Sequence, residues 1–488
     1  MLAALARGVP LAPVFAGIAL VQAGCAVGPD YKAPAAPTAT VYDTSNGVEG
    51  EKEIKPAAEQ APNARDVEAQ WWALFSSSRL NETMRLAIAQ SPTLPAARKT
   101  LEAAYEAIAV ARAGYLPRIN AVAGAQRGGT QLPGLPEQSG TTWSGGLSAS
   151  YSLNALGGST RRFVEEQQAN ADYYRYQLAA AYLTLTGNVA IQALTSAAVR
   201  LQIEATKELI ADDEKNLALT QREFEAGAAA RTDVLTAASQ LAADEANLPS
   251  LYQQLDVARH ALAVLVGKAP GEWEVPAFEL ADFRLPAALP LSLPAVLVRQ
   301  RPDVLSAEAE LRAGSAAIGV AVAQEFPSIS LTGSFTRQAL TAADLFHDFE
   351  RLWSAGGTVT QPLFQGGALR AQVREARDTF DAQAALYEQT VLQAFQQVAD
   401  SLRAVEHDSA RVAAYRRSLK IAEESLVLQR KSYAAGKTTV LQLIDAERTY
   451  SQAKLGSATA DASQLEDAVN LFVALGGGWW NAQVAEPR

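Results

Sequence analysis

Three histidines and one cysteine are the residues of this chain with the most versatile chemistry, and their placement argues against catalysis. The histidines, His260, His347 and His407, are far apart and have no ligand-like spacing. The glycines near residue 126 follow a strand pattern and do not precede a helix, so they do not form a phosphate-binding loop. The formal charge of -10 argues against nucleic-acid binding, which requires a basic face. We therefore expect no enzyme, no metal or other cofactor, and no nucleic-acid partner.

The only cysteine, Cys25, cannot form an internal disulfide. It follows a mostly apolar stretch, residues 9–24, that is typical of a secretory signal. The small residues Ala23 and Gly24 precede it, as at a bacterial lipoprotein processing site, although Gln22 stands where an apolar residue is usual. We expect Cys25 to be lipidated; the alternative is a plain signal region with a free or buried thiol.

A second feature is a stretch that occurs twice, at residues 224–237 and 433–446. Each copy has an aromatic residue, Ala and Gly, then a polar segment and an apolar helical run. Gly227 and Gly436 predict helix ends, because glycine takes the left-handed conformation without steric cost. Thr232 and Thr439 stand where the next helix would be N-capped. Each copy is therefore predicted to be the turn of a helical hairpin.

The two hairpins belong to a longer duplication. Residues 92–119 align without gaps to residues 302–329 at an offset of 210, and the offset is 209 between the hairpin glycines. The identical pairs include Leu101 with Leu311, Ile108 with Ile318, Ala111 with Ala321, and Pro117 with Pro327. A period of this length is too long for a small solenoid unit, so we infer two copies of one module.

Each module contains helical runs of unequal length. The long runs, 159–226 and 368–434, contain no proline, and at ~1.5 Å per residue each would be roughly 100 Å long. The returning runs, 232–266 and 439–475, are shorter, and Pro249 interrupts the first. Mixed apolar positions with many Ala, Gln and Ser residues indicate helices with one packed and one wet face, as in a hollow α-barrel rather than a solid bundle.

Alternating segments predict four β-strands of about 10 residues each, a length that crosses a bilayer as tilted β-structure. They lie near residues 119–126, 143–154, 328–336 and 353–360. One face is apolar and the other carries hydroxyls and amides. A soluble sandwich alternates in the same way. Small polar residues at nearly every inward position, with Trp143 and Trp353 near strand starts, favour a water-filled barrel with an interfacial girdle.

Four strands cannot close a barrel, and open sheet edges are not tolerated in lipid, so chains must pool strands. Two chains would supply eight strands and three would supply twelve, and physical reasoning alone leaves both open. The predicted order of segments is 1–24 signal peptide, 25–66 lipidated leader, 67–268 first repeat, 269–294 Pro-rich linker, 295–478 second repeat and 479–488 C-terminal tail.

Six short motifs carry a resemblance to a known family. They are Cys25-Ala-Val-Gly-Pro-Asp-Tyr31, Trp72-x-x-Phe75, Arg301-Pro-Asp-Val304, Phe326-Pro-Ser-Ile-Ser-Leu331, Pro362-Leu-Phe-x-Gly-Gly367 and Ala474-Leu-Gly-Gly-Gly-Trp479. In this order, and with the duplication, the chain resembles the TolC-like outer membrane factors, and within them the NodT-type efflux outer membrane lipoproteins. The resemblance runs from Cys25 almost to the C-terminus.

The resemblance implies a mostly α-helical fold with membrane β-strands. Three chains would form a homotrimer with a shared 12-stranded β-barrel in the outer membrane and an α-helical barrel through the periplasm. The implied partners are a periplasmic adaptor (membrane fusion) protein and an inner-membrane pump such as an RND transporter. The implied function is passive conduction of substrates from the pump, out of the cell.

The same resemblance assigns residues to a periplasmic gate. Asp445 matches an acid that forms an inner ring, and Leu441 matches the apolar ring beside it. They are four residues apart and so share a helix face. A ring of acids in a narrow pore raises its own pKa or attracts cations. The alternative is an ordinary solvated acid and a packing leucine.

The hairpin tips are expected to meet the adaptor through Gly227, Arg231, Asp233, Gly436 and Lys437. Solvent exposure alone is the other explanation for the two basic residues. Asp233 aligns with Gln442 and not with Asp445, so stabilisation of a helix N-terminus is sufficient to explain it. The number of acidic rings therefore stays open.

A periplasmic structural or adaptor coiled coil without a pore is the alternative function. The four strands discriminate between the two, because an adaptor needs no lipid-facing band.

Overall fold

The computed structural model describes residues 26–35, 69–130, 133–134, 138–153, 158–286 and 299–479. The predicted signal peptide, Cys25, most of the leader, residues 287–294 of the linker and residues 480–488 of the tail lie outside them. The chain divides into two compact units, to which both repeats contribute. We call them the strand unit (Met1–Pro34, Thr100–Arg175 and Ser306–Glu388) and the hairpin unit (Ala35–Lys99, Tyr176–Leu305 and Gln389–Arg488).

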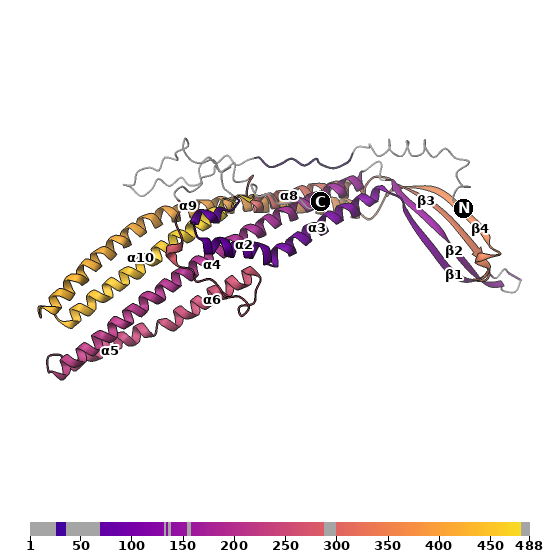
Figure 1. Cartoon of the computed structure of the whole chain (residues 1–488). Helices are drawn as coiled ribbons and strands as arrows, with labels where there is room; N and C mark the ends of the chain where they lie inside the picture. The colour runs from indigo at the N-terminus through magenta and orange to yellow at the C-terminus, as the bar shows by residue number, and fades with distance from the viewer. Residues whose placement is uncertain are drawn as a thin grey trace. The chain divides into compact units, whose positions relative to one another are not determined.

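The strand unit contains one antiparallel sheet with the strand order β1-β2-β3-β4 (Figure 1). The strands are β1 (Arg118–Thr130), β2 (Gln138–Leu153), β3 (Ser328–Ala339) and β4 (Glu350–Thr360). All four predicted strands are present, and their lengths of 11 to 16 residues exceed the expected ten. Both outer strands, β1 and β4, have one neighbour in the described sheet.

The register of the sheet gathers apolar residues on one face. Leu147 lies opposite Phe335, and Phe335 lies opposite Trp353. On the other face Ser148, Ser334 and Ser354 lie side by side, and the hydroxyl oxygens of Ser334 and Ser354 are 2.9 Å apart. Because side chains alternate along a strand, this register extends both faces over all four strands.

Helices lead into and out of the strands. Helix α3 (Thr93–Arg112) ends in the short 3-10 turn η3 (Ala113–Tyr115), and Pro117 then precedes β1. Proline favours extended geometry in its neighbour, which explains the switch from helix to strand. In the second repeat α8 (Pro302–Ala323) leads to β3, and the 3-10 turn η5 (Asp344–Phe346) lies between β3 and β4.

The two long helices have the predicted lengths. Helix α4 (Ser159–Glu225) and helix α9 (Ala368–Ala434) contain 67 residues each. One window of α4 is long and apolar enough to cross a bilayer, but 56% of that window is buried inside the protein. Packing against neighbouring helices accounts for its composition.

The returning helices differ between the repeats. The first repeat has α5 (Arg231–Glu245) and α6 (Leu248–Val266), whereas the second has one helix, α10 (Val440–Ala474). Pro249 lies in the first turn of α6, where its missing N–H costs no helical hydrogen bond. The predicted interruption at Pro249 is therefore confirmed.

The core of the hairpin unit forms around aromatic residues. The 3-10 helix η2 (Trp71–Phe75) supplies Trp71 and Phe75, which are fully buried, and the ring of Trp71 stacks on that of Phe472 at 5.6 Å. Helix α2 (Ser78–Gln90) adds Met84, and the 3-10 turn η4 (Leu280–Asp282) lies beside this core. Each fully buried large side chain contributes about 2 kcal/mol. The Trp72-x-x-Phe75 motif is thus part of the core.

Candidate functional site

Two turns connect the helices of the hairpins, and both end the long helix in the same way. Gly227 has φ +75° and Gly436 has φ +67°. The amide after each glycine donates back five residues: Ala228 N–H to the Glu223 carbonyl at 2.8 Å, and Lys437 N–H to the Ser432 carbonyl at 2.9 Å. This is the Schellman pattern, so the predicted glycine helix ends are confirmed. A Cβ would meet no atom within 4 Å at either position, so backbone conformation alone requires the glycines.

The returning helices begin differently after the two turns. Thr439 is the N-cap of α10: its hydroxyl accepts from Gln442 N–H at 3.4 Å, and the Gln442 side chain accepts from Thr439 N–H at 3.3 Å. The prediction for Thr232 is wrong, because α5 begins at Arg231 and its N-cap is Ala230, two residues before Thr232.

Ala230 has no side-chain acceptor for a cap, but Asp233 accepts from its backbone N–H. The Asp233 carboxylate lies 3.0 Å from this nitrogen, and the contact is half of a capping box. Gln442 occupies the same position in α10, as the alignment of the repeats predicts. Helix stabilisation therefore explains Asp233 locally.

The residues predicted for the gate lie on the exposed side of α10. Leu441 is 41% exposed, and Asp445 one turn later is also exposed. The adjoining face of the helix is buried: Val440 and Ile444 pack with Ala237 of α5. Leu441 and Asp445 thus share an exposed face of α10.

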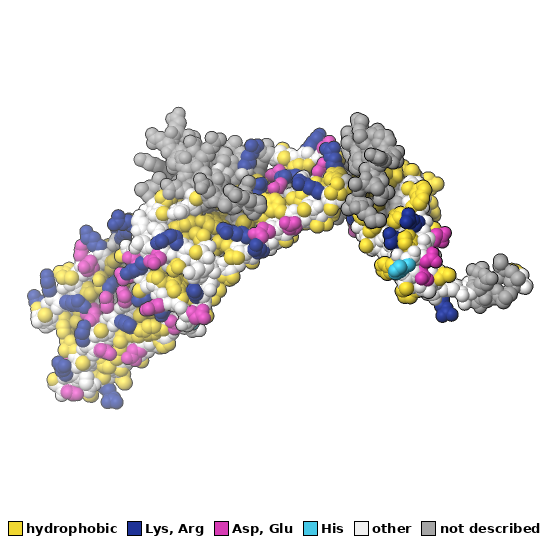
Figure 2. Space-filling model, turned by 45° about the vertical axis from the view of Figure 1, so that its right-hand side comes forward, with side chains coloured by type: hydrophobic (Ala, Val, Ile, Leu, Met, Phe, Trp, Pro, Cys, Tyr) yellow, Lys and Arg dark blue, Asp and Glu magenta, His cyan; other side chains and the backbone are white. Residues whose placement is uncertain are grey.

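The residues predicted for docking lie at the tips. Gly227, Gly436, Arg231 and Lys437 are exposed, and Asp233 is half-buried. On the face drawn in Figure 2, acidic and basic side chains are mixed along the hairpin helices. Among the described residues, no group of three His, Cys, Asp or Glu side chains could hold a metal ion.

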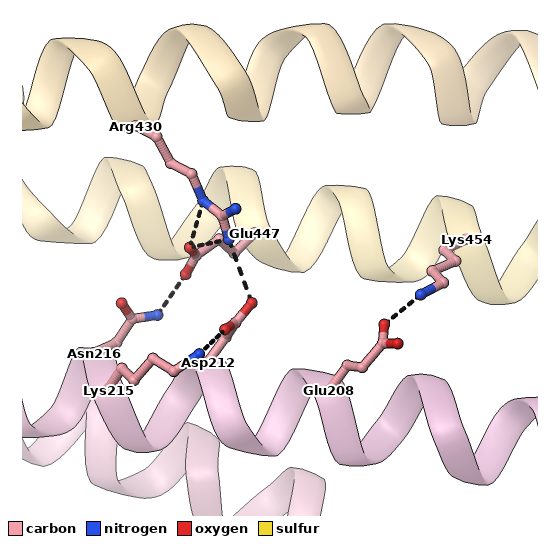
Figure 3. Close-up of polar contacts among 7 residues, drawn as sticks. All are labelled: Glu208, Asp212, Lys215, Asn216, Arg430, Glu447 and Lys454. Atoms are coloured by element: carbon pink, nitrogen blue, oxygen red, sulfur yellow. Dashed lines mark hydrogen bonds and ion pairs between the residues drawn. The ribbon is translucent and has the colours of Figure 1, made fainter.

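A polar network behind the tips joins the two hairpins, and the sequence did not predict it (Figure 3). Arg430 of α9 donates to Glu447 of α10 at 3.0 Å and to Asp212 of α4 at 3.4 Å. Asn216 of α4 donates to the other oxygen of Glu447 at 2.6 Å. Lys215 pairs with Asp212 at 2.9 Å. Glu447 is 9% exposed and so needs both its donors.

Two further contacts join α4 to the second hairpin. The Tyr433 hydroxyl donates to Glu223 at 2.5 Å, and burial together with this hydrogen bond raises the pKa of Tyr433 to about 12. Farther along, Lys454 pairs with Glu208 (Figure 3). Tyr433 is equivalent to Phe224 in the first repeat, so only the second turn has a hydroxyl there.

In the strand unit, the segment that follows Cys25 is held by one arginine. Arg162, whose side chain is 7% exposed, donates to the Val27 carbonyl at 2.9 Å and to the Asp30 carboxylate at 2.9 Å. Gly28 has φ +93°, and a Cβ there would lie 2.5 Å from the Cα of Gly319. Cys25 itself lies outside the described residues, but Arg162 and Gly319 form a binding position for the residues after it, which we call the seat.

Comparisons with known proteins agree on one kind of protein. A family model described as outer membrane efflux protein matches residues 83–268 and 293–477. The chain is 29% identical to nodulation protein T of Rhizobium leguminosarum bv. viciae over 96% of this chain and 94% of that protein. It is 30% identical to the pyoverdine export outer membrane protein OpmQ of Pseudomonas aeruginosa, over 84% and 87%. The solved outer-membrane channel OprN superposes with a TM-score of 0.81 at 28% identity, over 93% of this chain and 100% of that chain.

Proposed function

Because the chain belongs to the outer membrane efflux protein family, we propose that it is the outer membrane channel of a tripartite efflux system. It would receive substrates from an inner-membrane pump, such as an RND transporter, that a periplasmic adaptor links to it, and would conduct them passively out of the cell. One observation carries this function: a single chain combines a sheet with one apolar and one hydroxyl-bearing face and two long helical hairpins. The same sheet disfavours a periplasmic coiled coil without a pore, which needs no lipid-facing strands. The family consists of channels, so we propose no catalytic activity.

We propose that the working form is a homotrimer. In one chain β1 and β4 are edge strands, and their free N–H and C=O groups cannot face lipid. Three chains of four strands supply a closed 12-stranded barrel in the outer membrane.

We propose that Leu441 and Asp445 line the periplasmic gate. Their exposure on one face of α10 supports this role, since three copies around an axis would form an apolar ring and an acidic ring. The network centred on Arg430 would hold the two hairpins of each chain together while the gate is closed. The exposed tips at Gly227, Arg231, Gly436 and Lys437, with Asp233 beside them, would meet the adaptor.

We propose that Cys25 is lipidated and anchors the chain to the outer membrane. The seat that Arg162 forms for residues 27–30 supports a defined position for the anchor. We expect Cys25→Ser to lose fatty-acid labelling. Equal labelling of the variant and the parent would contradict the assignment.

The function is tested by planar-bilayer recording of the purified full-length protein. We expect discrete channels whose conductance rises in Leu441→Ala/Asp445→Ala, because the gate would lose its apolar and acidic rings. Glu424→Ala/Leu428→Ala is the matched control, since it removes an exposed acid and leucine four residues apart on α9. The complete lack of channels would contradict the function. Equal conductance of the gate variant and the control would contradict the gate assignment alone.

A further inference from the structure

Each hairpin contains a buried aspartate that faces a second aspartate on the returning helix. Asp213 of α4 is 3% exposed and faces Asp244 of α5. Asp408 of α9 is 5% exposed and faces Asp467 of α10. One carboxylate oxygen of each buried aspartate, Oδ2, has no hydrogen-bond partner in the described part of the chain. Buried polar groups are rarely left unsatisfied, so these two need an explanation.

In each hairpin, the aspartate on the returning helix lies three residues farther from the tip glycine than the buried aspartate does. Asp213 lies 14 residues before Gly227, and Asp244 lies 17 after it. Asp408 lies 28 residues before Gly436, and Asp467 lies 31 after it. The second pair is therefore farther from its tip by 14 residues on each helix, or about 21 Å at the rise of an α-helix. Both hairpins thus have an acid pair between the outgoing and the returning helix, at the same relative offset.

In the described part of the chain, no donor reaches Oδ2 of either buried aspartate. Gln240 donates to Asp244 at 2.5 Å, and Asn470 donates to Asp467 at 3.3 Å, so the half-buried partner of each pair has an amide donor. Two ionised carboxylates have only acceptors and repel each other at close range. One proton shared by the pair converts the repulsion into a hydrogen bond.

Other charged groups reach the first pair from neighbouring helices. Glu447 of α10 opposes ionisation of Asp213, and Arg448 favours it. Arg430 of α9 donates to this Glu447 carboxylate. Burial, the first cause, together with Asp244 raises the pKa of Asp213 to about 7.

The second pair has its own charged neighbours. Arg411 lies 2.8 Å from Asp408 and offsets part of the upward shift, as does His407. Glu466, next to Asp467 on α10, has a raised pKa because it is buried, although Thr195 of α4 donates to it at 3.1 Å. Burial and Asp467 raise the pKa of Asp408 to about 6.

We propose that Asp213 with Asp244, and Asp408 with Asp467, form two proton-binding sites that hold the helices of each hairpin together and release them when the proton is lost. The direction of the pH effect on hairpin stability follows from linkage, because the folded hairpin binds the proton more tightly than the unfolded chain. The stabilisation is complete below the ordinary aspartate pKa of 3.8 and is lost as the pH rises to about 7 for the first pair and about 6 for the second. The hairpins should therefore be tighter in acid than in mildly alkaline solution.

Two measurements on the full-length protein in lipid nanodiscs test the proposal without any need for conduction. Infrared spectra of the wild type should show a protonated carboxyl band that titrates near neutral pH. Hydrogen exchange of α4 and α5, corrected for the intrinsic pH dependence, should be at least about tenfold faster at about pH 8 than at about pH 5, because one pKa unit is a factor of ten. An excess of Ca²⁺ at about pH 8 should leave the exchange unchanged.

The variants distinguish the pairs from general charge effects. Asp213→Asn keeps the shape of the side chain and cannot ionise, so we expect it to flatten the pH dependence of the first hairpin and to remove its part of the infrared band. Asp408→Asn should do the same for the second hairpin. Glu214→Gln removes an exposed acid next to Asp213 and should behave as the wild type. The proposal is overturned if wild type and Asp213→Asn have the same pH dependence, or if Ca²⁺ rather than protons restores protection.

Discussion

Removal of the guanidinium of Arg430 should loosen the tie between the two hairpins. Arg430 is the one side chain that contacts both Glu447 of α10 and Asp212 of α4 in the network of Figure 3. Arg430→Met keeps most of the aliphatic stem and removes the charge. Glu447 then keeps Asn216 as its described donor while it stays buried.

The size of the effect follows from the exposure of each partner. Arg430 is 52% exposed and Asp212 34%, so their ion pair is close to a surface pair and contributes about 0.5 kcal/mol. Glu447 is only 9% exposed, and leaving a buried carboxylate short of a donor costs about 1–3 kcal/mol. A total near 2 kcal/mol shifts the equilibrium between joined and separated hairpins by roughly 30-fold.

Planar-bilayer conductance and hydrogen exchange measure this shift. We expect Arg430→Met to raise the fraction of time in the larger-conductance state and to speed exchange in α10 near Glu447. The control is Arg416→Met, because Arg416 is 65% exposed and its ion pair among the described residues, with Asp461, lies within the second hairpin. Arg430→Met/Glu447→Gln should recover most of the wild-type behaviour, since no unpaired charge is then buried. Equal behaviour of Arg430→Met and Arg416→Met would refute the reasoning.

Three further predictions concern single residues. Gly436→Ala should destabilise the second hairpin by about 1–2 kcal/mol, because alanine is strained at φ +67°; an unchanged thermal unfolding midpoint would contradict this. Tyr433→Phe should lower the free energy of unfolding by about 1 kcal/mol, because the hydrogen bond to Glu223 is lost. The wild type should lose this advantage only as the pH rises from about 10 to about 12. Denaturant unfolding at several pH values measures both effects. Arg162→Gln should release the segment after Cys25, so trypsin should cut after Lys32 at least about tenfold faster. Equal cleavage rates would contradict the binding of this segment by Arg162.

The sequence predicted the elements well because their signals are local. Proline, glycine and alternation predict where helices and strands lie, as Pro249 at the start of α6 demonstrates, although β2 begins at Gln138 rather than near residue 143. The sequence predicts Thr232 as a cap because a threonine near a helix start is a good cap in isolation. The nearby acid Asp233 instead accepts from the Ala230 amide, and the N-cap lies two residues before Thr232.

The contacts of the candidate site were harder to predict. Arg430 and Asp212 are 218 residues apart in the sequence, and nothing in either helix marks them as partners. The difference between Tyr433 and Phe224 was visible in the aligned repeats, but only the packed hairpins show that the hydroxyl meets Glu223. Residues that act through distant partners therefore need the fold before they can be found.

Disulfide cross-linking between edge strands tests the central claim, a pore built from the strands of three chains. Cysteines would replace Ala123 on β1 and, one at a time, Ala355, Gly357 and Val359 on β4, with each single replacement as its own control. If β1 of one chain pairs with β4 of the next, oxidation of the correct pair should give covalent products of two and three chains and none larger. Products that end at two chains, or no cross-link for any pair, would contradict the trimeric barrel.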